Sequence, residues 1–483
     1  MPSKISGQGL SYSDVFIRPG LSDIRSRHGT QISTSTVIAR GLPPIHLPII
    51  SANMDTVTEH LMATTMACLG GLGIIHRFMS PEAQASEVKL VKDLVRVIED
   101  DPPVVSVDTP IADVVALQKR RGRGYVIVYK GKNFNGKFVG IATNRDYPAA
   151  SPTDPISKVM TPRSRVIAVP FGTKQEAAMR KMQLHRIQKI PVVNARGILD
   201  GVYTLKDFSY KGEFPNGSFD KNGRLMVGAA IGVRSSDIDR AHLLVTAGVD
   251  VLVLDIAHGG LIYTQEMLRR LKVKEKIKIP ILAGNIATAE GARYIYDSGA
   301  DGVKVGVGPG YVCETRNIAG IGMPQITAVM EVSQALSKKR HKIPIMADGG
   351  IREPGDLPKA IVAGASSVMI GSLFAGTAES PGEPLLDNGI LKKFVQGMAS
   401  ASAFQKRKSL GDSSTNGEHY TPEGRVIATP YKGSVKKILY AFDGGLRSSM
   451  SYVGAHSLKE LQTKGQFITV THAGATENKR DLH

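Results

Sequence analysis

The chain has 483 residues, 42% of them hydrophobic and 22% charged, a composition typical of a soluble globular protein and not of a disordered or collagen-like one. Its 61 basic and 43 acidic residues give a net charge of +18, which favours anionic partners; the basic residues are scattered, so phosphorylated small molecules are expected rather than nucleic acid. Two cysteines exclude a disulfide framework, and no apolar run approaches the ~18 residues of a membrane span, so we expect a cytoplasmic protein without membrane contact, with organelle targeting left open.

Short apolar runs bounded by glycine or proline recur along the chain, and segments with helical periodicity lie between them. Strands are predicted at residues 45–51, 71–76, 225–232, 249–257, 279–285, 301–307, 343–350 and 366–372. Helices are predicted at residues 56–69, 234–247, 288–298 and 325–337. Eight parallel strands with helical crossovers predict an α/β fold, a (β/α)8 TIM barrel whose active site lies at the carboxyl ends of the strands.

The gap between the second and third predicted strands is too long for one crossover, so we expect an inserted domain at residues 100–215, with the barrel formed by residues 1–99 and 216–483. The insertion contains a repeat: "VVSVDTPIADVV" is echoed by "VIAVPFGTKQEA", and each copy runs on to a Thr-x-x-Asp ending. This pattern resembles a tandem CBS (Bateman) regulatory domain. The resemblance implies that adenine or guanine nucleotides bind between the modules, with ribose held by Thr143, Asp146, Thr204 and Asp207. The alternative is an assembly module that binds nothing.

Polar residues and glycines follow the predicted barrel strands, where core packing would favour neither. They are Ser51, Asn53, His76, Asp255, Asn285, the loop 306–310, Asp348 and the pair Gly371-Ser372. Glycine loops allow the backbone to approach a ligand, and their N–H groups form anion sites. "MADGGI" and "MIGSL", at the last two strands, therefore predict a phosphate site, and the Asp348 carboxylate beside it suits a ribose.

Cys313 lies in the glycine-rich stretch "GVKVGVGPGYVCETRNIAGIG", which offers no apolar shelter, whereas Cys68 lies in the apolar "MACLGGLG". A thiolate in such a loop can attack an electrophilic ring carbon of a nucleotide whose phosphate is anchored across the barrel mouth. Thr315, two residues later, is placed to transfer a proton at the same atom. The alternative is that Cys313 is an inert thiol.

Eight segments together resemble the IMP dehydrogenase and GMP reductase superfamily over nearly the whole chain: "GVGPGYVCETR", "SANMDTVTE", "LDIAHG", "AGN", "ADGGI", "MIGS", "GMASASA" and "GGLRSSMSYVGA". The resemblance implies a purine-nucleotide oxidoreductase in which Cys313 bonds to purine C2 beside a nicotinamide. It implies that the substrate is bound by Ser51, Met54, Gly310, Asp348, Gly350, Gly371, Ser372, Gly397 and Met398. It also implies that the cofactor is bound by Asp255, Ala257, Asn285, Gly306 and Gly308.

The resemblance also implies a homotetramer or octamer, and a K+ ion held by the main chain of Gly308, Gly310 and Cys313. Three positions depart from the family pattern. Tyr311 replaces a serine in the cysteine loop, Glu314 replaces threonine or isoleucine, and Phe394 stands where a tyrosine is expected. Two hydroxyl contacts to phosphate are thereby put in doubt.

The flap after "GMASASA" separates the two activities of the superfamily. Dehydrogenases carry an Arg-Tyr pair there that activates water, and "FQKRKSLGDSSTNGEHYTPEGRVIATPYKG" has none. Reductases need a general acid for the departing amine. Thr315 and Glu423 match the reductase positions. We therefore expect an NADPH-dependent GMP reductase that releases IMP and ammonia, with catalytic residues Cys313, Thr315 and Glu423.

The alternative is an NAD-dependent IMP dehydrogenase, which "GGLGIIHRFMSPEAQA", the CBS pair and the C-terminal segment favour. Its water-activating base would then be sought among the basic flap residues Lys406, Arg407 and Lys408. A hypothesis from another class is a catalytically silent nucleotide sensor. The presence of Cys313, Thr315 and Asp348 argues against a silent sensor.

Overall fold

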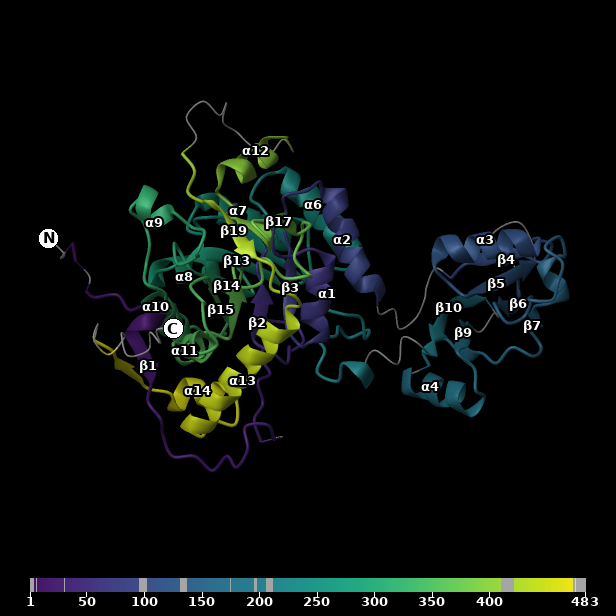
Figure 1. The fold of residues 1–483 in the computed structure, drawn as a ribbon, viewed down its shortest axis with the longest axis horizontal. Coiled ribbons are helices and arrows are strands. Elements are labelled where there is room, and N and C mark those ends of the chain that lie inside the picture. The colour runs from purple at the N-terminus through teal and green to yellow at the C-terminus, as the bar shows by residue number, and fades with distance from the viewer. Residues whose placement is uncertain are drawn as a thin grey trace. The chain divides into compact units, whose positions relative to one another are not determined.

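The computed structural model describes residues 4–5, 7–29, 31–94, 102–130, 137–173, 175–194, 198–205, 212–409, 421–471 and 474. The chain folds into two compact units, one made of Met1–Leu94 with Asn216–His483 and the other of Val95–Pro215 (Figure 1). Each unit is described by itself. No helix in the described ranges is both long and apolar enough to span a membrane.

The larger unit is a closed barrel of eight parallel strands, as predicted (Figure 1). Around the barrel the order is β11-β12-β13-β14-β15-β16-β2-β3. The strands are β2 (Ile49–Ser51), β3 (Leu72–Ile75), β11 (Gly228–Ile231), β12 (Val251–Asp255), β13 (Ile281–Ile286), β14 (Gly302–Val305), β15 (Ile345–Asp348) and β16 (Ser367–Ile370). All eight lie within or within one residue of the predicted runs.

The observed strands are shorter than the predicted ones, and proline explains three of the starts. β2, β13 and β15 begin directly after Pro48, Pro280 and Pro344. Proline has no N–H to donate to a neighbouring strand, so the first N–H available to the sheet is that of the next residue. The three proline carbonyls still accept bonds from Val368, Leu252 and Val303.

Helices surround the barrel, and the four predicted ones are present. α10 has the predicted bounds, whereas α1 starts later than predicted because the preceding residues form a turn tied by Thr58, whose Oγ1 donates to the Ala52 carbonyl at 2.7 Å. The helices of this unit are α1 (His60–Cys68), α2 (Pro81–Leu94), α6 (Ser236–Thr246), α7 (Ile262–Arg269) with η3 (Arg270–Lys274), α8 (Ala289–Asp297), α9 (Thr315–Ile318), α10 (Gln325–Ser337), α11 (Asp356–Val362), α12 (Ala401–Ser409), α13 (Lys436–Val453) and α14 (Leu458–Lys464).

Two further sheets belong to this unit. β17 (Leu385–Asp387), β18 (Ile390–Gln396) and β19 (Val426–Pro430) form an antiparallel sheet, in which β18 precedes the flap and β19 belongs to its C-terminal part. β1 (Val15–Ile17), just after η1 (Tyr12–Asp14), pairs with β20 (Phe467–Thr469) and so joins the two ends of the unit.

The smaller unit contains two copies of one arrangement, in the element order of the predicted repeat. In each, a short strand pairs in parallel with a second strand, a helix connects them, and a third strand returns antiparallel. The first copy comprises β4 (Val104–Ser106), α3 (Ile111–Arg121), β5 (Tyr125–Lys130) and β6 (Lys137–Thr143), followed by η2 (Ile156–Lys158) and β7 (Thr161–Pro162). The second comprises β8 (Val169–Pro170), α4 (Gln175–Leu184), β9 (Lys189–Val193) and β10 (Leu199–Thr204).

Candidate active site

A cavity of about 260 Å³ opens at the carboxyl ends of the barrel strands. Its wall includes the three catalytic candidates Cys313, Thr315 and Glu423. It also includes every predicted cofactor residue, namely Asp255, Ala257, Asn285, Gly306 and Gly308. Of the predicted substrate residues, the wall includes Met54, Gly310, Asp348, Gly397 and Met398. The structure thus gathers residues from seven separate stretches of sequence around one space.

Four predicted substrate residues do not line this cavity: Ser51, Gly350, Gly371 and Ser372. Ser51 is fully buried, and its hydroxyl oxygen lies 2.9 Å from that of Thr58, within hydrogen-bond distance. Gly371 adjoins the wall, because a Cβ added there would meet the sulfur of Met54 at 2.8 Å. Gly350 follows the wall residue Gly349 with a φ of +81°, in the region that favours glycine.

The cysteine loop places two catalytic candidates in direct contact. The Cys313 thiol donates to Thr315 Oγ1 over 3.2 Å, and the Cys313 N–H donates to the Gly310 carbonyl at 3.1 Å. Cys313 is half-buried, whereas Cys68 is buried and packed in α1. A half-buried thiol beside a hydroxyl is accessible to a ligand and has a partner for its proton.

Flap residues 421–425 run antiparallel to the cysteine loop. Cys313 and Gly424 form a β-bridge. On either side of it, the Glu314 N–H donates to the Glu423 carbonyl at 2.8 Å and the Arg425 N–H to the Val312 carbonyl at 3.1 Å. This backbone pairing fixes Glu423 beside the cysteine, although the two are far apart in sequence.

A buried lysine joins two carboxylates beneath the cavity. Lys304 Nζ lies 2.6 Å from both Asp255 Oδ1 and Asp348 Oδ2. Burial alone would lower the pKa of Lys304, but the two carboxylates outweigh it and raise that pKa. Burial would likewise raise the pKa of Asp255, but the Lys304 ammonium and the Asn53 amide hold it below its usual value. Lysine and Asp255 are therefore both charged at neutral pH.

Asn285 presents an unused acceptor to the cavity. Its Nδ2 donates to the Gly306 carbonyl at 2.7 Å and to Asp348 Oδ2 at 2.9 Å. Its Oδ1 is buried and has no hydrogen-bond partner among the described residues. A buried acceptor of this kind is costly unless a ligand N–H group reaches it. The carboxamide of a nicotinamide is such a group, so the site fits the predicted cofactor.

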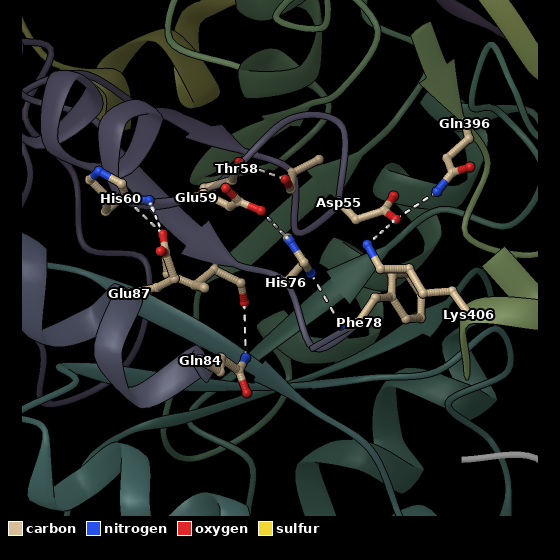
Figure 2. A network of polar contacts seen from close by, with 12 residues as sticks. Asp55, Thr58, Glu59, His60, His76, Phe78, Gln84, Glu87, Gln396 and Lys406 are labelled. Atoms are coloured by element: carbon tan, nitrogen blue, oxygen red, sulfur yellow. Dashed lines mark hydrogen bonds and ion pairs between the residues drawn. The ribbon is translucent and has the colours of Figure 1, made fainter. Parts of the chain in front are cut away.

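Figure 2 shows a polar network beside the cavity, around the strand-end residue His76. The buried His76 ring receives the Phe78 N–H at Nδ1 over 3.1 Å, and its Nε2 lies 3.2 Å from Glu59 Oε1. This hydrogen bond lowers the pKa of Glu59. With both nitrogens engaged, His76 shapes the turn that carries Arg77 and Phe78 into the cavity wall.

The same network ties the flap helix to the barrel. Asp55 Oδ2 accepts from Gln396 Nε2 at 2.6 Å and lies 3.2 Å from Lys406 Nζ (Figure 2). One residue on, Arg407 lines the cavity; its guanidinium carbon lies 5.9 Å from the centre of the Phe78 ring. Phe394, by contrast, is half-exposed on β18 and does not line the cavity.

Among the wall residues that the sequence analysis missed, three have charged or aromatic side chains: Arg77, Phe78 and Lys304. Lys304 had a signal, because a charged residue inside the apolar strand "GVKVGV" must have a buried partner. Arg77 and Phe78 directly follow the selected His76. Arg407 was named only under the dehydrogenase alternative, since "QKRKS" is also what a solvated helix face contains.

The inserted unit has a cavity of its own, of about 440 Å³. Thr143 and Asp146 line it, Thr204 does not, and Asp207 lies outside the described residues. Thr143 donates both its N–H and its hydroxyl to Asp146 Oδ2, at 2.6 and 2.8 Å. The wall also contains four cationic side chains, those of Arg145, Arg165, Arg186 and Lys189.

Comparisons with known proteins agree with this geometry. The model of the IMP dehydrogenase / GMP reductase domain matches residues 9–481. Proteins named inosine-5'-monophosphate dehydrogenase are 43% identical over 476 residues in Nitrosopumilus maritimus, covering 98% of each chain, and 42% identical over 480 residues in Bacillus subtilis, covering 99% of this chain and 96% of the relative.

Among solved structures, a cysteine-to-alanine variant of GMP reductase from Trypanosoma brucei, in complex with guanosine 5'-monophosphate, superposes with a TM-score of 0.89 at 38% identity. It covers 98% of this chain and 97% of that one. The Trypanosoma brucei enzyme in complex with guanosine 5'-triphosphate has a TM-score of 0.79 at 35% identity, over 96% of this chain and 98% of that one.

Proposed function

Because the chain belongs to the IMP dehydrogenase / GMP reductase family, we propose that it is a GMP reductase, which converts GMP, NADPH and one proton to IMP, ammonia and NADP+. Membership of the family gives the general activity, that of an oxidoreductase of purine nucleotides that uses a nicotinamide cofactor. The choice between reductase and dehydrogenase is ours. It rests on one observation: the flap sequence has no Arg-Tyr pair, and the flap residues 423–425 that pair with the cysteine loop include Glu423.

The proposed reaction begins with the Cys313 thiol, which adds through its sulfur to purine C2. The Thr315 hydroxyl, 3.2 Å away, accepts the thiol proton and passes its own proton on to the Glu423 carboxylate. Glu423 then donates the proton with which the exocyclic amine leaves C2 as ammonia. The C2–N bond breaks and the C2–S bond remains. A water-activating base is not needed, since no oxygen is added to C2.

When bound, the nicotinamide supplies the hydride that reduces C2, so that the C–S bond breaks and IMP is released. Asn285 Oδ1 would accept from its carboxamide, and Asp255 would hold the neighbouring ribose. Cys313 regains one proton when its sulfur departs. In the same scheme Asp348 binds the substrate ribose, and Gly350, Gly371 and Ser372 bind the phosphate by their main-chain N–H groups.

A specific observation favours IMP dehydrogenase as the second candidate. Arg407, a flap-helix residue, lines the cavity, and its buried Nε has no hydrogen-bond partner among the described residues. An arginine in that position can orient or activate water. The relatives named above as dehydrogenases point the same way. In that case Arg407→Met would abolish the conversion of IMP and NAD to xanthosine monophosphate over many turnovers.

Glu423→Gln tests the reductase assignment. An amide cannot donate the proton that the departing amine needs, and one general acid contributes about 10²- to 10⁴-fold, so kcat with GMP and NADPH should fall by that factor. The affinity for GMP, measured by calorimetry, should change much less. Glu266→Gln on the exposed face of α7 is the matched control and should leave kcat unchanged. An unchanged kcat in Glu423→Gln would remove this glutamate from the mechanism.

The inserted unit is, in this proposal, a CBS pair that binds a regulatory adenine or guanine nucleotide. The cavity lined by Thr143, Asp146 and four cationic side chains supports a ligand with ribose and phosphate groups. Main-chain binding of K+ at Gly308, Gly310 and Cys313, a homotetrameric or octameric assembly and a cytoplasmic location belong to the same proposal.

A further inference from the structure

Arg425 lies two residues beyond Glu423 and makes three contacts with the cysteine loop. Its Nε lies 3.2 Å from Glu314 Oε1. Its Nη2 donates to the Tyr311 carbonyl at 3.0 Å. Its guanidinium also stacks over the Tyr311 ring, with Cζ 5.4 Å from the ring centre. The side chain of Arg425 therefore contacts the cysteine loop on both sides of Cys313, at Tyr311 and at Glu314.

The backbone on either side supports the same arrangement. The Arg425 N–H donates to the Val312 carbonyl, and the Arg425 carbonyl accepts the Gly397 N–H at 2.9 Å. The backbone of Arg425 thus joins the flap both to the cysteine loop and to the segment that follows β18. The side-chain contacts of Arg425 add charge and stacking to a very short ladder, which by itself would open readily.

Tyr311 and Glu314 are two of the three positions at which this chain departs from its family pattern. Both departures supply a partner for Arg425: an aromatic face in one case and a carboxylate in the other. A serine or threonine at these positions could offer neither a cation–π contact nor an ion pair. The contacts with Arg425 give these substitutions a physical reason that the sequence alone did not reveal.

We propose that Arg425, Glu314 and Tyr311 form a clasp that holds flap residues 421–425 closed on the cysteine loop and so keeps Glu423 beside Cys313. Arg425 is a positioning residue, since it acts through Glu423 and not on the substrate. The kinetic part of this proposal rests on the proposed function; the closure itself does not.

The clasp is partly exposed, with 50% of the Arg425 side chain and 24% of the Glu314 side chain accessible. Each contact is therefore weak alone and screened by salt. Acting together, an exposed ion pair, a cation–π contact and a hydrogen bond correspond to a change of about 3- to 30-fold in the closed-to-open ratio of the flap.

The rate at which Cys313 is alkylated by iodoacetamide reports closure without any turnover. The chain has one other cysteine, Cys68, and it is buried in α1. Arg425→Met should raise the alkylation rate of Cys313 in the full chain by about 3- to 30-fold, because the flap opens more often. Losing a positive charge near a thiol disfavours the reactive thiolate, so this electrostatic change works against the expected increase.

Two variants sharpen the measurement. Arg270→Met is the matched control, because Arg270 pairs with Glu275 at nearly the same exposures, 49% and 25%, away from the cavity. It should leave the rate unchanged. Arg425→Lys keeps the charge but loses the planar stacking surface and the fork of donors, so its rate should be intermediate. High salt should accelerate alkylation of the wild type and hardly affect Arg425→Met.

In the GMP and NADPH assay, Arg425→Met should lower kcat by a factor in the same range while KM for GMP changes little. Equal alkylation rates in Arg425→Met and wild type would overturn the clasp, whatever the kinetics. A faster alkylation in Arg425→Met, together with a wild type that does not reduce GMP, would uphold the clasp and reject the reductase assignment.

Discussion

At the scale of single residues, the site depends on groups whose chemistry is set by immediate neighbours. Cys313 is half-buried and hydrogen-bonded to Thr315, whereas Cys68, the other free thiol, is buried in α1. Asp255 and Asp348 share one ammonium, that of Lys304. These contacts give the two thiols different exposures and partners, and they keep the charges of Asp255, Asp348 and Lys304 paired.

Cys313→Ala should abolish turnover and leave GMP binding largely intact, because the atom that bonds to C2 is lost while the ribose and phosphate contacts lie elsewhere. Cofactor oxidation and calorimetric GMP binding measure the two effects separately. Cys68→Ala is the control and should retain turnover. Turnover by Cys313→Ala would exclude a covalent mechanism.

Lys304→Met should destabilise the barrel by about 3–5 kcal/mol at pH 7, since it leaves buried carboxylates without their counter-charge. The lowered pKa of Asp255 contributes stability above its unfolded value of about 4, and this contribution is lost as pH falls through the lower folded value. The raised pKa of Lys304 contributes stability that is lost only above about pH 10.

The difference in unfolding free energy between wild type and Lys304→Met should therefore be constant near neutral pH and shrink below about pH 4. Urea unfolding at a series of pH values measures it. A difference that stays the same down to pH 3 would mean that Asp255 does not depend on Lys304.

At the scale of elements, the barrel was predictable because each strand is a short apolar run with sharp ends. "IHLPIIS" and "IPIMADGG" combine buried β-branched residues with a proline start and a polar end. What the sequence did not predict is contact across loops. The pairing of residues 421–425 with the cysteine loop is non-local, and neither "TPEGR" nor "YVCET" alone indicates its partner. The carboxylate partners of Lys304, at the ends of β12 and β15, are non-local in the same way.

A glycine at the end of α13 offers a test of element packing. Gly454 has a φ of +69°, and a Cβ there would lie 2.4 Å from the Leu21 carbonyl oxygen. Gly299, after α8, has a φ of +93° and open space around it. An alanine in a left-handed conformation costs about 1–2 kcal/mol, so Gly299→Ala should lose about that much stability. Gly454→Ala should lose more, because backbone must also move.

Thermal unfolding of the two variants measures the comparison directly. A clearly lower midpoint for Gly454→Ala than for Gly299→Ala is expected. Equal midpoints would show that the N-terminal segment at Leu21 does not pack against the end of α13.

At the scale of the whole molecule, the barrel unit contains all eight strands and the whole candidate cavity without the inserted unit. The barrel residues next to the insertion are tied to the barrel itself. Lys92, near the end of α2, is buried with its Nζ 3.0 Å from Asp220 and 2.8 Å from Asp250. The ion pairs of Lys92 therefore fix the barrel segments that come just before and just after the inserted unit.

Deleting residues 100–215 and closing the gap with a short linker should leave a folded, active barrel, because no wall residue of the candidate cavity is removed. Adenine and guanine nucleotides should alter the rate or assembly of the full chain and have no such effect on the truncated one. Circular dichroism, light scattering and the cofactor assay measure these properties. A full chain that does not respond to any of these nucleotides would reject the regulatory proposal.

The most direct test of the central claim is chromatographic identification of the products from two incubations of the full chain. With GMP and NADPH, the account predicts IMP and one ammonia for each NADPH oxidised, over many turnovers. With IMP and NAD, it predicts little xanthosine monophosphate, because the flap has no Arg-Tyr pair to activate water. Sustained formation of xanthosine monophosphate, with no ammonia released from GMP, would contradict the account and assign the chain as an IMP dehydrogenase.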